Sequence, residues 1–318
     1  MTADGAFRWT AQGDMDPIDV LCRRIVTLGP CDMPRDLARE VEAGIQRCVA
    51  ELDRDLDRDA VRGLHNTLLH VGGRPESRVA GRGFRLPAHE AATFNVAASW
   101  MPDRDDRRFV APAVWSALAT SDALGGVPAA AFTTAIALSV DLGRRLQQAT
   151  PDAGAQGHHD AIYAGFVAAA CAAKLRGFSS DALRNALGIM LSQAAGTTQA
   201  TRDHASGDQL QIAFNVGDGL KSVMLASVGV TGVRRVASGE FSFLKLFSRS
   251  PDPRPLTSDL HHVWSVRGRF MLSRSPGVSV DAQNTLARAS KPTSGNDPFD
   301  LFEPLFSVDA NATGNTDE

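Results

Sequence analysis

The 318-residue sequence contains no apolar run near the roughly 20 residues that a helix needs to cross a bilayer. Its first residues, MTADGAFRWTAQGDMDP, lack a basic start followed by an apolar stretch, so no signal peptide is visible. The formal net charge is −3, which gives no general attraction to phosphate backbones or anionic lipid. We therefore expect a cytoplasmic protein that has neither a nucleic acid nor a membrane as its partner.

Cysteine and lysine are scarce. The cysteines lack the paired C-x-x-C spacing of a structural zinc site, so we expect reduced thiols and no metal. A catalytic thiol stays open as a minor alternative. A mechanism that needs a lysine has few candidates. The residues concerned are Cys22, Cys31, Cys48, Cys171, Lys174, Lys221, Lys245 and Lys291.

The abundant residue is alanine, which dominates most segments from residue 88 onward. Alanine has the best helix propensity, and small residues let helix axes approach closely. Apolar spacing predicts earlier helices at 17–27 and 34–55, followed by a Gly- and Pro-rich loop at 71–87. Ser179 or Ser180 is expected to cap a helix that Gly196 ends. A mainly all-α fold follows, with one candidate strand at 264–274 and a helix at 214–228.

The tail, residues 290–318, mixes polar, acidic and proline residues and is expected to be flexible and disordered. It contains an apolar island that docks either on a partner or back on its own domain, and the sequence leaves both open. The island consists of Phe299, Leu301, Phe302, Leu305 and Phe306.

Four segments carry a resemblance to a known family. The most specific is GHHDAIYAGFVAAACAAKLRGFSSDALRNALGIMLSQAAGTTQATRD, at 157–203. RVAGRGFRLPAHEAATFNVAAS (with Asn95), the helical pair at 110–149, and the Gly-x-Thr-Gly turn within 217–247 add to it. Together they resemble the MmgE/PrpD family of lyases over roughly residues 78–275.

The resemblance implies a large helical domain, usually dimeric, with a smaller lid domain. We expect the helical domain at 1–255, a truncated remnant of the lid at 256–289, and the tail after it. Family members are mainly 2-methylcitrate dehydratases, cis-aconitate decarboxylases and epimerases, which use histidines, an acidic stretch and a lysine, with no metal or organic cofactor. A small-molecule substrate and a homodimer are the partners that this implies.

One histidine site of the family is kept as His158 or His159, and the spacing to Lys174 favours His158. Such a residue serves as a general acid or base or contacts a carboxylate. The alternative is a surface loop pair without a role. Tyr163 is the single tyrosine and lies one helical turn beyond His159. Its hydroxyl either holds the substrate or packs inside the core.

The family's other site segments are altered. Asp105 and Asp106 stand where His-Pro is expected. With Asp103 they form either a base cluster that contacts the substrate or, as the simpler interpretation, a solvated loop. In the second case the aspartates pair with neighbouring arginines, which are Arg104, Arg107 and Arg108.

Asp203 is kept, but Asp208 takes the position of the family lysine, Gln209 that of an arginine and Gln211 that of a histidine. A lysine-to-aspartate change reverses the charge that would bind a substrate carboxylate. His204 is a neighbouring histidine that can act instead.

The prediction is therefore a site with one set of catalytic residues and one set of substrate-binding residues. The catalytic set is His158, Asp203 and His204. The substrate-binding set is His159, Tyr163, Asp105, Asp106 and Asp208. His261 and His262 are treated as surface residues.

Three functions remain. The favoured one is a divergent lyase or isomerase that acts on a small organic acid or related metabolite without a cofactor. The others are a non-catalytic binding or assembly protein, and an ordinary 2-methylcitrate dehydratase or cis-aconitate decarboxylase. A lysine or several arginines placed beside His158 by the fold would restore the case for the ordinary lyase.

Overall fold

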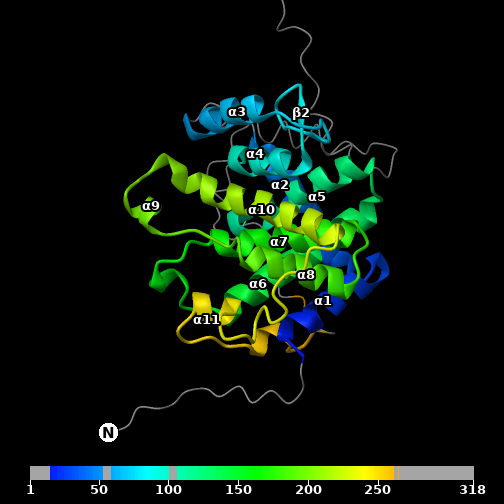
Figure 1. Ribbon diagram of the computed structural model, residues 1–318. Helices are drawn as coiled ribbons and strands as arrows, with labels where there is room; N and C mark the ends of the chain where they lie inside the picture. Colours follow the sequence, from blue (N-terminus) through cyan, green and yellow to red (C-terminus); the bar gives the residue numbers. More distant parts are fainter. Residues whose placement is uncertain (1–14, 53–58, 100–105, 261–263, 265–318) are drawn as a thin grey trace, which may run out of the picture.

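The computed structural model describes residues 15–52, 59–99, 106–260 and 264. Within them the chain is mainly helical, which confirms the mainly all-α prediction (Figure 1). A two-stranded antiparallel hairpin within the expected loop, β1 (Ser77–Arg78) and β2 (Arg85–Leu86), is the one sheet of the described residues. The predicted tail and its apolar island, the candidate strand after residue 264, and the pair His261 and His262 lie outside the described residues.

The helices follow the alanine-rich segments. They are α1 (Pro17–Thr27), α2 (Arg35–Ala50), α3 (Asp59–Val71), α4 (Ala88–Ala98), α5 (Ala111–Leu124), α6 (Ala129–Ala149), α7 (Ala161–Leu175), α8 (Ser180–Leu191), α9 (Gln199–Arg202), α10 (Leu210–Ser227) and α11 (Phe243–Phe247). Short 3₁₀ turns are η1 (Pro30–Asp32), η4 (Gly154–Gln156), η5 (Ser206–Gln209) and η6 (Arg254–Leu256), and one π turn is η3 (Asp106–Val110).

Helix α7 forms the centre of the molecule, with α5, α6, α8 and α10 packed around it (Figure 1). All of its residues from Ala161 to Ala173 are buried. The small alanine side chains of α7 leave room for these four neighbouring helices. The apolar area that they bury stabilises the fold by roughly 25 cal/mol per Å². The expected alanine-packed core is therefore present.

Helix α8 begins as the sequence predicts but ends earlier than expected. Ser179 caps α8 as predicted, since its hydroxyl accepts from the Ala182 amide at 3.2 Å. The helix stops at Leu191, ahead of Gly196. The reason is tertiary: Asn215 on α10 binds both backbone polar groups of Ala195, which a continuing helix would need for itself.

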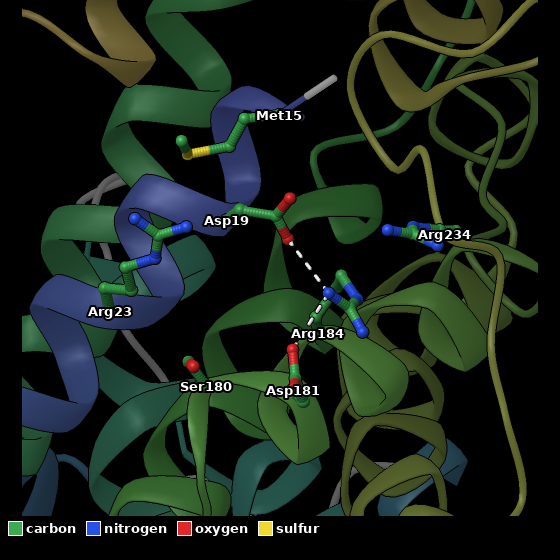
Figure 2. A pocket seen from close by; sticks show the side chains of 7 residues that line it. All are labelled: Met15, Asp19, Arg23, Ser180, Asp181, Arg184 and Arg234. Carbon is green, nitrogen blue, oxygen red and sulfur yellow. Dashed lines mark hydrogen bonds and ion pairs between the residues drawn. The ribbon is translucent and has the colours of Figure 1, made fainter. Parts of the chain in front are cut away.

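Helix α8 also touches the segment that follows α10. A Cβ atom added at Gly188 would lie 2.4 Å from the carbonyl oxygen of Val233, and one added at Gly232 would lie 2.3 Å from that of Asn185. Real Cβ atoms do not come so close, so both positions need glycine. This contact fixes the Gly-x-Thr-Gly turn on α8 and brings Arg234 to a pocket between α1 and α8 (Figure 2).

The lid remnant was expected to begin at residue 256. The chain around this point, after residue 252, packs on α6. Arg145 on α6 donates from Nη1 to the carbonyl oxygens of Pro255 and Ser258, at 2.7 and 3.0 Å. The Arg24 guanidinium lies 4.7 Å from the centre of the Trp264 ring. The described part of this segment is thus held to the helical domain by buried arginines.

None of the helices in the described ranges combines the length and apolar character needed to span a bilayer. Among the cysteines, Cys31 is exposed and the other three are buried. Burial raises the pKa of the Cys171 thiol to about 12, and burial, aided by Asp19, raises the pKa of Cys22 further. A thiol with so high a pKa is a poor nucleophile, so neither residue suits a catalytic role.

Candidate functional site

A cleft of about 560 Å³ opens between the loop ahead of α7, the π turn η3 and the start of α10. Both histidines of the Gly-His motif line it, together with residues that the sequence places far apart. The lining consists of Arg107, Arg108, Gly154, His158, His159, Asp160, Thr198, Thr201, Arg202, Asp208 and Ile212.

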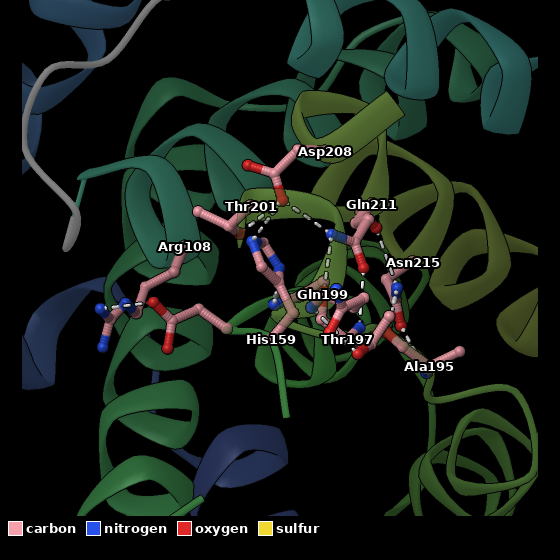
Figure 3. A network of polar contacts seen from close by, with 11 residues as sticks. Arg108, His159, Ala195, Thr197, Gln199, Thr201, Asp208, Gln211 and Asn215 are labelled. Carbon is pink, nitrogen blue, oxygen red and sulfur yellow. Dashed lines mark hydrogen bonds and ion pairs between the residues drawn. The ribbon is translucent and has the colours of Figure 1, made fainter. Parts of the chain in front are cut away.

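The segment at 195–197 directly precedes Thr198, which lines the cleft, and two amide side chains of α10 hold it (Figure 3). Gln211 binds Thr197 at both backbone groups, accepting its N–H at 2.8 Å and donating to its carbonyl at 3.2 Å. Asn215, one turn further along, binds Ala195 in the same way at 3.2 and 2.8 Å. The two amides replace a neighbouring strand and so satisfy the backbone.

The other edge of this segment binds the histidine loop. The His159 amide donates to the Gly196 carbonyl at 3.2 Å, and the Thr198 amide donates to that of Gly157 at 2.9 Å. Gly196 has φ +141°, and a Cβ there would lie 3.1 Å from the His159 Cβ. Glycine is therefore required at 196, and this pairing sets the position of both histidines.

A Gly196→Ala variant is expected to lose about 1–3 kcal/mol of unfolding free energy, because it forces a side chain into a backbone conformation that L-residues rarely adopt. Gly63→Ala is the matched control. It lies inside α3 with no atom within 4 Å of its added Cβ, so it is expected to gain about 0.5–1 kcal/mol. Urea denaturation followed by far-UV circular dichroism measures both. Equal losses in the two variants would contradict the assignment.

His159 is held in one tautomer by its own helix. Its Nδ1 accepts the Ala161 amide hydrogen at 3.1 Å, so the neutral ring carries its proton on Nε2. That atom lies 3.6 Å from Oδ1 of Asp208. The same carboxylate oxygen accepts from the Thr201 hydroxyl at 2.7 Å and from the Gln211 amide at 2.9 Å. In this state His159 presents a donor to the cleft.

His158 has different surroundings. Its ring packs edge-on against Phe247 of α11, with centroids 5.0 Å apart and an interplanar angle of 87°. Among the described residues no hydrogen bond reaches its ring nitrogens, so a lone pair remains for a proton. His158 is therefore the better general base and His159 the better donor.

Three arginines share this cleft with the histidines. Arg108 is buried and its Nη2 lies 2.7 Å from Oδ2 of Asp160, while Arg202 is exposed. Two carboxylates, those of Asp160 and Asp208, line the same cleft. Arg107 and Arg108 were expected to pair with loop aspartates, and nothing in the sequence pointed to Arg202. The fold thus places three arginines and both histidines in the lining of one cleft.

Several predicted site residues lie elsewhere. Asp203 and His204 are exposed and do not line the cleft; Asp203 accepts from the Gln199 amide at 2.8 Å. Tyr163 is only 2% exposed, and its hydroxyl binds that of Thr150 at 2.8 Å. Burial raises the pKa of Tyr163, and its ring packs in the core, as in the second interpretation of this residue.

The aspartate cluster predicted at this site, with Asp105 and the side chain of Asp106, lies outside the described residues. In the described part of the chain, His, Cys, Asp and Glu form no group of three suited to a metal ion. The acid and base groups that the structure describes in the cleft are its two histidines, its arginines and its aspartates, Asp160 and Asp208.

Comparison with known proteins agrees with this fold. No curated protein matches the chain. The sequence model of the MmgE/PrpD N-terminal domain matches residues 51–256, beginning ahead of the resemblance noted from 78 and including the whole cleft. Because the match covers well over half of the 318 residues, this chain belongs to the MmgE/PrpD family.

Proposed function

We propose that this protein is a lyase or isomerase that acts on a small organic acid by acid/base chemistry, without a metal or an organic cofactor. The observation that carries the proposal is the placement of His158 and His159 in one cleft with three arginines. A guanidinium group binds a carboxylate through two parallel hydrogen bonds, which both orients the acid and stabilises charge on it.

In the proposed reaction His158 removes a carbon-bound proton beside a substrate carboxylate. The C–H electron pair moves toward that carboxylate, and the arginines stabilise the charge that develops there. In an elimination the pair then forms the double bond, while a hydroxyl leaves with the proton that His159 Nε2 donates. Base and acid thus come from neighbouring residues whose surroundings differ.

Asp208 does not by itself argue against an acidic substrate. Its Oδ1 accepts two hydrogen bonds and lies near His159, so much of its charge serves contacts inside the protein. The positive charge that the family lysine would supply comes instead from arginines on η3 and α9. For this reason 2-methylcitrate and cis-aconitate belong among the first substrates to test.

The test is turnover by the purified chain of a panel of di- and tricarboxylic acids, followed by the ultraviolet absorbance of the double bond formed or lost. Arg202→Met is expected to lower kcat/KM about tenfold, chiefly through KM, because it removes one charge-assisted hydrogen bond. Arg62→Met is the control, since Arg62 is an exposed arginine of α3. No turnover or binding of any acid would contradict the proposal and favour a non-catalytic family member.

A further inference from the structure

A second pocket, of about 350 Å³, lies away from the cleft between α1, α8 and the segment after α10. Arg23 enters it from α1, Arg184 from α8, and Arg234 from the segment that the glycine contact holds on α8 (Figure 2). Three arginines from three separate elements meet around one hollow. None of the residues of the proposed catalytic cleft takes part.

The three arginines differ in their partners. Arg184 is shared by two carboxylates, with its Nη1 3.5 Å from Oδ1 of Asp19 and 3.0 Å from Oδ1 of Asp181. Arg23 and Arg234 have no carboxylate within ion-pair distance among the described residues. Two guanidinium groups with uncompensated charge therefore face the pocket from opposite sides of Arg184 (Figure 2).

The walls are held firmly by contacts outside the pocket. Asp16 caps α1, accepting from the Ile18 amide at 2.9 Å, and its Oδ2 also accepts from the amides of Ala237 and Ser238 at 3.0 and 2.8 Å. This buried carboxylate joins the start of α1 to the segment that carries Arg234. The backbone that carries these arginines is thus fixed before a ligand arrives, so that binding has to order only their side chains.

We infer that this pocket binds a phosphorylated small molecule that also carries hydroxyl groups, such as a sugar phosphate. A phosphate dianion matches the two uncompensated arginines, and the hydroxyl of Ser180, the first residue of α8, adds a donor. Asp19 and Asp181 repel an all-anionic ligand but accept hydrogen bonds from hydroxyl groups. The volume is near the lower end of small-molecule pockets, which suits a ligand of this size.

Isothermal titration calorimetry of the full chain at constant ionic strength tests the inference, with ribose 5-phosphate, ribose and inorganic phosphate as probes. Ribose 5-phosphate is expected to bind more tightly than inorganic phosphate, and ribose not at all. Arg23→Ala and Arg234→Ala, both at exposed side chains, are each expected to weaken binding about tenfold. Arg62→Ala, an exposed position of α3 that lines neither pocket, is expected to bind as the parent does.

Absence of ribose 5-phosphate binding, or equal binding by the Arg23→Ala/Arg234→Ala double variant and the parent, would overturn the inference. Equal affinity for inorganic phosphate would overturn the role given to the two aspartates. Far-UV circular dichroism of each variant checks that the helical fold is kept. Since the probes carry no carboxylate and the variants leave the cleft intact, the result is independent of the organic-acid assay.

Discussion

A His158→Ala variant is expected to turn over the organic acid about 10²–10⁴-fold more slowly than the parent, mainly through kcat. The reason is local: among the described residues no hydrogen bond occupies the His158 ring nitrogens, while Nδ1 of His159 is occupied by the Ala161 amide. One ring is available to take a proton and the other is not. Steady-state kinetics in the ultraviolet assay measures the loss.

Two further variants make this result specific. His204→Ala removes an exposed histidine outside the cleft and is expected to keep full activity. His159→Gln retains an N–H donor where Nε2 stands, so its loss is expected to be smaller than that of His158→Ala. If His158→Ala retained the parent's rate, the assignment of the base would be wrong. If only the His159→Gln variant lost activity, His159 would be the general base instead.

The sequence predicts the histidines of this site but not the rest of its lining. The Gly-His motif directly precedes an alanine-rich helix, and the local pattern is enough to place it. Asp203 and His204 are also close in sequence to a cleft residue, Asp208. They point elsewhere because the chain turns through α9 and η5, and His204 adopts φ +53°. Such turns depend on tertiary contacts that residue spacing does not encode.

The helices of the core were predicted more completely than the site. Helix α3 was not expected, although its buried residues Val61, Leu64 and Leu68 follow helical spacing. For Asn95 the sequence predicted the helix but not the role of the side chain. It was noted for its resemblance to the family, and the structure shows it fully buried, binding the Ala80 amide at 2.8 Å and the Arg78 carbonyl at 3.2 Å. A helix pattern cannot reveal that a polar residue holds a distant loop.

Helix α6 carries buried charged side chains whose loss is expected to lower the stability of the fold strongly. Asp141 is 2% exposed, and its Oδ2 lies 2.9 Å from Nε of Arg145 and 3.8 Å from Nη2 of Arg24. Burial lowers the pKa of Arg24, and Asp141 acts against that change. The carboxylate thus places a negative charge beside two buried guanidinium groups. Those cations in turn hold the segment after residue 252 and the ring of Trp264.

An Asp141→Asn variant is therefore expected to lose about 3–5 kcal/mol of unfolding free energy, since the amide has the same shape but removes the negative charge that lies beside two buried guanidinium groups. Urea denaturation followed by far-UV circular dichroism measures the change. Asp59→Asn is the control, because it removes the exposed carboxylate that pairs with Arg62 and is expected to leave stability unchanged within error. A small effect at Asp141 would mean that water or neighbouring groups compensate the arginines.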